Sequence, residues 1–136
     1  MLVDTGPLVA LFDPREALHS RSVDFLKKLS APPVTTVPVL TEAFHLLNPA
    51  SRGSIALRSL LRAGGLSIWH PDSVAIGRML DMMDQYLDHP MDLADASLVV
   101  AAEYLAIRKI FTFDRNHFAS YRFRRGRRLE AFVIIG

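Results

Sequence analysis

An apolar helical run that opens with two aspartates constrains the fold of this chain more than any other segment. Asp92 and Asp95 stand three residues apart at its start, so both carboxylates face one side of the first helical turn. A helix N-terminus favours carboxylates by roughly 0.3–1 kcal/mol, which would explain Asp92 as a capping residue. Asp95 shares its stripe with Leu98, Val99 and Ala102, and is therefore drawn toward the interior. A carboxylate that faces inward needs a partner.

Three further acidic residues stand beside apolar segments. Asp4 ends the short strand that opens the chain, and Asp114 ends a later one. Right-handed crossovers bring the carboxyl ends of parallel strands to one edge, so we expect Asp4 and Asp114 to meet there. Glu42 lies in a mostly apolar helix, either on its one solvent-facing stripe or turned into a shared acidic site. Periodicity leaves both interpretations open.

Strand and helix patterns alternate along the chain, which predicts an α/β layered domain with a mainly parallel central sheet flanked by helices. The length of 136 residues suits a single domain spanning residues 1–136. The predicted strands are 2–4, 34–37, 66–69, 109–114 and 131–135, and the predicted helices are 7–12, 15–30, 39–47, 52–63, 72–88 and one that starts near residue 92.

Composition limits the partners that these acids can have. The chain has no cysteine, which excludes disulfides, thiolate metal sites and a cysteine nucleophile. The first residues are not typical of a signal or transit peptide, and charges interrupt every apolar run well before about 18 residues. We therefore expect a cytoplasmic protein with no membrane segment.

Four carboxylates from four segments would repel one another, and their pKa values would rise unless a cation kept them ionised. Ligation by oxygen alone favours Mg²⁺, or Mn²⁺ as a substitute, over zinc. The five histidines show no zinc-binding spacing and are interpreted as surface or capping residues. The acidic residues therefore predict a site for a hard divalent cation.

The C-terminal part of the chain is strongly basic. Residues 105–136 contain eight Lys and Arg residues against two Asp and Glu residues. Arginines so close together repel one another unless an anion neutralises them, which favours phosphate as a ligand. A solvated loop before the last strand explains the same residues without a ligand. The densest group is Arg122, Arg124, Arg125, Arg127 and Arg128.

Four motifs along the chain carry the candidate acids. They are Leu-Val-Asp-Thr-Gly-Pro at residues 2–7, Val-Leu-Thr-Glu-Ala at 39–43, Asp-Leu-Ala-Asp-Ala-Ser-Leu at 92–98 and Ile-Phe-Thr-Phe-Asp-Arg-Asn-His-Phe at 110–118. In this order the motifs resemble those of PIN-domain ribonucleases, and the size and layout of the chain resemble the VapC-type toxins of type II toxin-antitoxin systems. The resemblance covers nearly the whole chain and implies a PIN-like fold and a Mg²⁺-dependent endoribonuclease.

The resemblance also implies roles for individual residues. Asp4, Glu42, Asp95 and Asp114 become the catalytic and metal-binding acids, with Asp92 as either an additional ligand or a capping residue. The implied supporting residues are Thr5, Thr112 and Asn116. Asn116 stands where many relatives have another acid, which leaves open whether one or two metal ions bind. The implied partners are RNA, held by Arg115 and the five later arginines, a cognate antitoxin and a second copy of the chain.

The same residues allow three alternative functions. A PIN fold can serve as an RNA-binding or scaffold module with weak or no catalysis. The Asp4-Thr5-Gly6 sequence also occurs in retroviral-type aspartic proteases, but those are all-β whereas this chain has mostly helical patterns. A haloacid-dehalogenase phosphatase would need a second aspartate at position 6, which is glycine here.

Overall fold

A computed structural model describes all residues 1–136. Its elements in chain order are β1 (Leu2–Val3), α1 (Thr5–Phe12), α2 (His19–Lys27), β2 (Val34–Thr36), α3 (Val37–Leu47), α4 (Arg52–Arg62), β3 (Ser67–Trp69), α5 (Ser73–Gln85), α6 (Leu93–Leu105), β4 (Lys109–Phe111), α7 (Arg115–Ser120), β5 (Arg122–Arg125), β6 (Arg128–Ala131) and β7 (Val133–Ile135).

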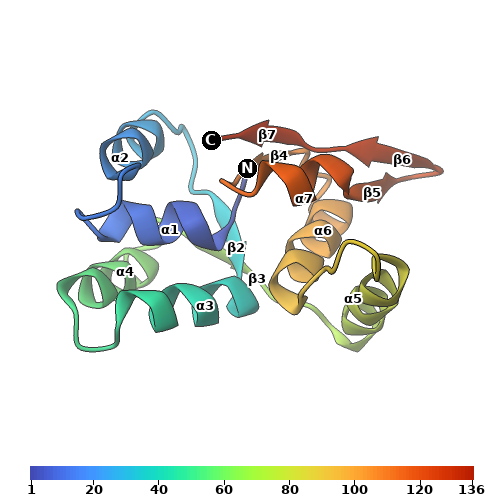
Figure 1. The fold of residues 1–136 in the computed structure, drawn as a ribbon, viewed down its shortest axis with the longest axis horizontal. Coiled ribbons are helices and arrows are strands. Elements are labelled where there is room, and N and C mark those ends of the chain that lie inside the picture. Colours follow the sequence, from blue (N-terminus) through green and yellow to red (C-terminus); the bar gives the residue numbers. More distant parts are fainter.

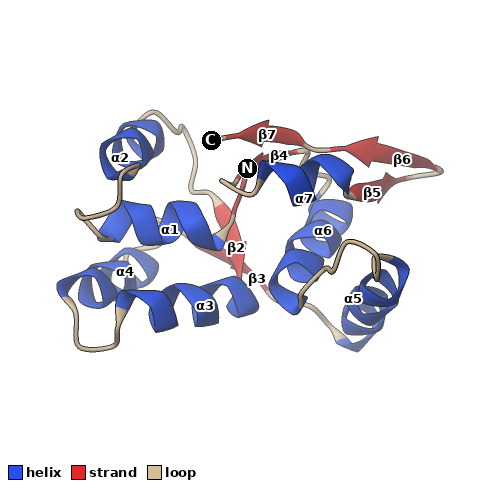
Figure 2. Ribbon diagram, viewed as in Figure 1, coloured by secondary structure: helices blue, strands red, loops and turns tan.

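The central sheet has five strands in the order β3-β2-β1-β4-β7, and every neighbouring pair is parallel. Helices α1 to α4 gather on one side of this sheet, and α5 and α6 lie on the other (Figures 1 and 2). The predicted α/β layered domain with a parallel central sheet is therefore confirmed. No helix is both long enough and apolar enough to cross a membrane.

The strand order changes direction at β1, in the centre of the sheet. Strands β2 and β3 follow β1 on one side, whereas β4 and β7, which come later in the chain, lie on its other side. Such a switch point is where ligands bind in open α/β sheets. The backbone N–H of Asp4, just after β1, donates to the carbonyl of Phe111 at the end of β4 at 2.9 Å. The carboxyl ends of these two strands therefore meet, as predicted.

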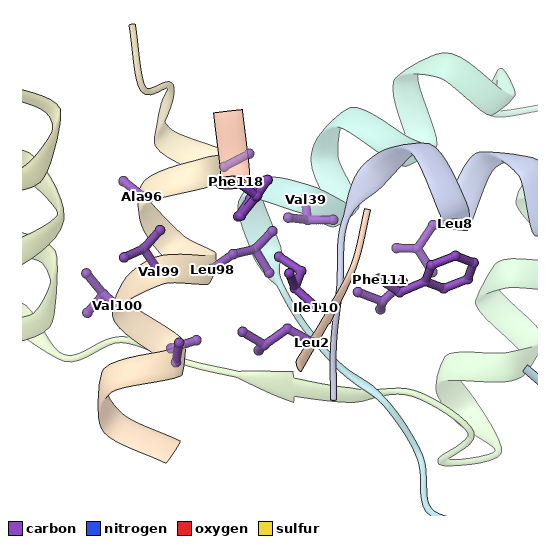
Figure 3. Packing of buried hydrophobic residues seen from close by; sticks show 14 of the residues in the cluster. Leu2, Leu8, Val39, Ala96, Leu98, Val99, Val100, Ile110, Phe111 and Phe118 are labelled. Atoms are coloured by element: carbon purple, nitrogen blue, oxygen red, sulfur yellow. The ribbon is translucent and has the colours of Figure 1, made fainter. Parts of the chain in front are cut away.

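Helix α6 is buried on nearly all sides because it packs against α3, α5, β2 and β5. Eight of its thirteen residues are buried, and four of these are alanines whose small side chains let neighbouring elements approach closely. Figure 3 shows Leu98 of α6 near Leu2 and Ile110 of the sheet. This packing holds the N-terminal turn of α6, which carries Asp95, close to the sheet edge.

The helix predicted over residues 15–30 is shorter in the structure, where α2 spans only His19–Lys27. The Asp13 side chain accepts a hydrogen bond from the backbone N–H of Arg15 at 3.0 Å. This local bond, together with Pro14, forms a turn that competes with helix formation. The prediction was therefore wrong at both ends, over residues 15–18 and over residues 28–30.

The arginine-rich segment is a β-hairpin and not a loop. Strands β5 and β6 pair in antiparallel register, with Arg125 opposite Arg128. The two-residue turn between them begins with Gly126 at φ 63°, a conformation that glycine adopts without strain. Phe123 is fully buried, and its ring centroid lies 4.9 Å from that of Phe132. This contact anchors the hairpin, and the last strand of the main sheet begins only at Val133.

Candidate active site

Three of the predicted site aspartates are the N-cap residues of helices. Asp4 caps α1, Asp92 caps α6 and Asp114 caps α7. Each carboxylate accepts a hydrogen bond from a backbone N–H of its own helix, at 2.7, 2.8 and 3.2 Å. The positive end of each helix dipole therefore faces a carboxylate. The capping interpretation of Asp92 agrees with this geometry.

Two threonine residues contact three of the acids. Asp4 is only 8 % exposed, and its Oδ2 accepts a hydrogen bond from the Thr112 hydroxyl at 2.7 Å. The Thr112 oxygen in turn accepts one from the backbone N–H of Asp114 at 3.0 Å. Glu42 lies on the exposed face of α3, yet its Oε2 accepts a hydrogen bond from the Thr5 hydroxyl at 2.8 Å. Glu42 is therefore exposed to solvent and is also bonded to the residue that follows Asp4.

Burial is the largest influence on the pKa of Asp4. It raises the pKa of this carboxyl to about 6, although the Thr112 hydroxyl and the Thr5 backbone N–H both stabilise the ionised form. Repulsion from Glu42 and Asp114 raises the pKa further. The Asp4 side chain is therefore ionised only in part at slightly acidic pH when no cation is bound.

Asp95 has a partner that sequence reasoning missed. Its Oδ2 accepts a hydrogen bond from the hydroxyl of Tyr121 at 2.9 Å. Tyr121 is fully buried and packs edge-on against Tyr86 and Phe118, with ring centroids 5.2 Å away in both cases. Burial, and then repulsion from Asp92, raise the pKa of Asp95 to about 7 despite this bond. Nothing in the sequence pairs Tyr121 with an aspartate 26 residues earlier.

Helix α7 places three polar residues at the edge of the cluster. His117 Nδ1 lies 2.7 Å from Asp114 Oδ2, and no other basic side chain lies within ion-pairing distance of a predicted site acid. Asn116 is exposed and forms no side-chain hydrogen bond. The Arg115 guanidinium donates a hydrogen bond to the carbonyl of Gly136. The five later arginines lie on the β5–β6 hairpin, outside the carboxylate cluster.

The donor chemistry of the cluster fits a hard divalent cation. All the candidate ligands are carboxylate oxygens, and no Lys or Arg forms an ion pair with any of them. Burial, and then repulsion between the carboxylates, raise the pKa values of Asp4 and Asp95. As the structure stands, however, no three Asp, Glu or His side chains are arranged to hold a metal ion. The residues therefore match a hard divalent cation in the type of their ligand atoms, but they do not form a complete coordination sphere.

Comparison with known proteins agrees with this architecture. The chain is 28 % identical over 126 residues to the Mycobacterium tuberculosis protein Ribonuclease VapC26, with 90 % of this chain and 92 % of that protein covered. Its fold is similar to the crystal structure of M. tuberculosis VapC20, a Sarcin-Ricin loop cleaving toxin, with a TM-score of 0.76, 18 % identity and coverage of 85 % and 90 %.

A second solved structure is a toxin-antitoxin complex from Klebsiella pneumoniae, with a TM-score of 0.63, 18 % identity and coverage of 88 % of this chain and 90 % of that one. The family model described as PIN domain matches residues 1–124, which include all the candidate acids. The chain therefore belongs to the PIN domain family.

Proposed function

We propose that the chain is a Mg²⁺-dependent endoribonuclease, with Mn²⁺ as a substitute metal, and that it acts as the toxin of a toxin-antitoxin pair. The observation that carries the proposal is the gathering of Asp4, Glu42, Asp95 and Asp114 at one edge of the parallel sheet without a Lys or Arg partner. The similarity to a protein named as a ribonuclease supports it. We further propose that residues 1–136 form a single PIN-like domain.

In this proposal Asp4 and Asp95 hold the ion, and Glu42 and Asp114 either complete the ligand set or orient the attacking water. When bound, Mg²⁺ would promote attack by water on a phosphodiester and neutralise charge on the phosphorus oxygens. The Thr112 hydroxyl fixes one oxygen of Asp4 and leaves the carboxylate less free to rotate. Asp114 must share its carboxylate with His117.

The test of this function is cleavage of RNA by the purified protein. We expect cleavage with Mg²⁺ or Mn²⁺ and none after chelation with EDTA, measured on total RNA and on single-stranded oligonucleotides. The alternative function, an RNA-binding or scaffold module, is less well supported because the four acids are all present. A folded protein that binds RNA but cleaves none with either metal would establish that alternative.

A pair of substitutions separates the two aspartates of α6. Asp92→Ser keeps a side-chain oxygen that can cap the helix, so we expect most of the cleavage activity to remain. Asp95→Ser removes a proposed metal ligand together with the acceptor of the Tyr121 hydroxyl, and we expect it to abolish cleavage. Cleavage rates at saturating Mg²⁺ measure both effects. Equal loss in the two variants would make Asp92 a ligand as well.

The proposed partners follow from the same function. A toxin of this type would bind a cognate antitoxin, and a short reading frame for a DNA-binding protein beside the gene would support this. We also propose a homodimer, because α5 exposes the apolar side chains of Val74 and Leu80 at 74 % and 52 %. Sedimentation velocity of the purified chain measures its oligomeric state.

A further inference from the structure

A groove lined by arginines separates α5 from the β5–β6 hairpin. Its volume is about 460 Å³, and its walls carry Arg78 and Gln85 of α5 together with Arg124, Arg127 and Arg128 of the hairpin. Figure 1 shows this hairpin projecting beyond α7 at one end of the molecule. We propose that the groove binds the phosphodiester backbone of RNA, an inference that rests on the ribonuclease function proposed above.

Not every arginine of this region is free to bind a ligand. Arg78 forms a bidentate ion pair with Glu103, at 3.2 and 3.0 Å. Arg125 lies 3.8 Å from Glu130 across the hairpin. The Arg122 guanidinium donates to two backbone carbonyls, one of them at the end of α7. Hydrogen bonds within the protein therefore hold Arg78 and Arg122, and a longer ion pair holds Arg125.

The remaining three arginines of the hairpin are exposed and unpaired. Arg124, Arg127 and Arg128 have no carboxylate partner and no side-chain hydrogen bond. All three line the groove. Guanidinium groups so close together repel one another, and a phosphate neutralises them through bidentate hydrogen bonds. The free positive charge of the segment is therefore concentrated on one wall of the groove.

The hairpin that carries these residues is held in place. The Glu103 side chain is only 10 % exposed, and it accepts hydrogen bonds both from Arg78 and from the backbone N–H of Arg124 at 3.0 Å. It thereby ties α5, α6 and β5 together. Burial of Phe123 fixes the other face of the strand. Because these contacts already hold the β5–β6 hairpin in place, binding of a ligand does not have to order it.

The composition of the groove favours RNA over a protein segment. Leu129 is the one hydrophobic residue among those that line it. Protein interfaces usually have an apolar centre, which this groove lacks, whereas contacts to a nucleic acid backbone are predominantly polar and cationic. The groove therefore offers the charge that a phosphodiester chain needs and little of the apolar surface that a peptide would bury.

The hairpin is also connected to the acidic cluster. Tyr121 immediately precedes β5, and its hydroxyl donates to Asp95. The backbone N–H of Arg122 donates to the hydroxyl of Tyr86, whose ring packs on Tyr121. These contacts join the base of the hairpin to the carboxylates that are proposed to cleave RNA. The basic groove attracts the negatively charged RNA backbone, which a cluster of carboxylates repels.

Three serine substitutions test the groove. The variant Arg124→Ser/Arg127→Ser/Arg128→Ser is compared with Arg21→Ser/Arg58→Ser/Arg62→Ser, which removes the same charge from exposed positions on α2 and α4. The probe is a fluorescein-labelled single-stranded RNA of about 12 nucleotides, within the usual site sizes. Fluorescence anisotropy in EDTA, over a series of KCl concentrations, reports affinity without cleavage.

We expect the hairpin variant to bind this RNA about tenfold more weakly at low salt. The slope of log K against log salt should fall by about 2, since each phosphate contact contributes about 0.7 on a single strand. The control variant should keep a slope close to that of the wild type. Equal losses in the two variants, or none in either, would overturn the proposal.

Two further results separate this inference from the proposed function. Wild-type protein that binds the RNA through the hairpin but never cleaves it with Mg²⁺ would refute the ribonuclease function and leave the groove assignment standing. Metal-dependent cleavage combined with wild-type RNA binding by the hairpin variant would refute the groove alone. If that variant instead loses a co-expressed antitoxin, the groove is a protein-docking surface.

Discussion

Asp4→Asn and Asp95→Asn are each expected to reduce RNA cleavage by about a thousandfold or more while the protein stays folded. Each substitution removes one negative charge from the proposed metal ligands, and a thousandfold loss corresponds to about 4 kcal/mol of transition-state stabilisation. Cleavage rates at saturating Mg²⁺ measure the effect. Full activity of either variant would contradict the proposed assignment of the acids.

The fold should survive these changes because asparagine preserves much of the local bonding. At position 4 an amide oxygen can still accept the hydrogen bond that the Thr5 backbone N–H donates at 2.7 Å. The Thr112 hydroxyl loses its acceptor, but its oxygen can accept a hydrogen bond from the new amide. In the metal-free protein at pH 8, removal of a buried charge should keep the melting temperature at or above the wild-type value.

A matched control distinguishes loss of a ligand from a general effect of charge. Asp24→Asn makes the same chemical change at an exposed position on α2, outside the acidic cluster. We expect it to leave both cleavage and the melting temperature close to wild type. A comparable loss of activity in this variant would mean that overall charge, and not the site, controls cleavage.

Much of the fold was predictable because its elements depend on local patterns. The strand that contains Leu2 and the one that contains Ile110 are short apolar runs, each followed by an aspartate that caps a helix. Parallel pairing then brings their carboxyl ends together without further information. For this reason the sequence placed Asp4 and Asp114 at one edge, which the structure bears out.

The contacts that the sequence did not predict join residues far apart in the chain. The residues involved lie in charged or solvent-facing segments, where a role on the surface explains them without such contacts. Tyr121 and Phe123 lie in an arginine-rich segment for which a solvated loop was one open interpretation, whereas their burial depends on rings such as Phe118 and Phe132. The one local signal was Gly126, which suits the first position of a two-residue hairpin turn. Periodicity likewise could not show that the exposed Glu42 is reached by a hydroxyl from α1.

The metal-free protein is expected to be less stable at pH 8 than at pH 5. Asp4 and Asp95 have pKa values of about 6 and about 7 in the folded protein, against about 3.9 in an unfolded chain. Between these values the folded state binds protons that the unfolded state has released, so stability falls as pH rises through this window and stays low above it. Asp13, whose pKa Arg15 lowers, changes its charge only below this range.

The size of this effect is bounded by the pKa differences. Between pH 5 and pH 8 the shifts at Asp4 and Asp95 each correspond to roughly 1–3 kcal/mol, because solvent screening reduces the larger shift of the less buried Asp95. For a chain of this length, that lowers the melting temperature by several degrees, which thermal denaturation in EDTA at pH 5 and pH 8 measures. In Asp4→Asn/Asp95→Asn this difference should largely disappear. A wild-type protein that is equally stable at both pH values would show that the two carboxyls are not destabilised by burial.

Added Mg²⁺ should reverse the same destabilisation. An ion that binds only the folded protein, at about 100 times its Kd, adds about 2.7 kcal/mol to the free energy of unfolding. Binding needs ionised carboxylates, so the gain in melting temperature should be large at pH 8 and small at pH 5. The double asparagine variant should show no gain at either pH. The charges that destabilise the metal-free protein are the same charges that the ion must neutralise. Wild-type melting curves that do not change across millimolar Mg²⁺ and Mn²⁺ at pH 8 would therefore contradict a metal site at Asp4 and Asp95.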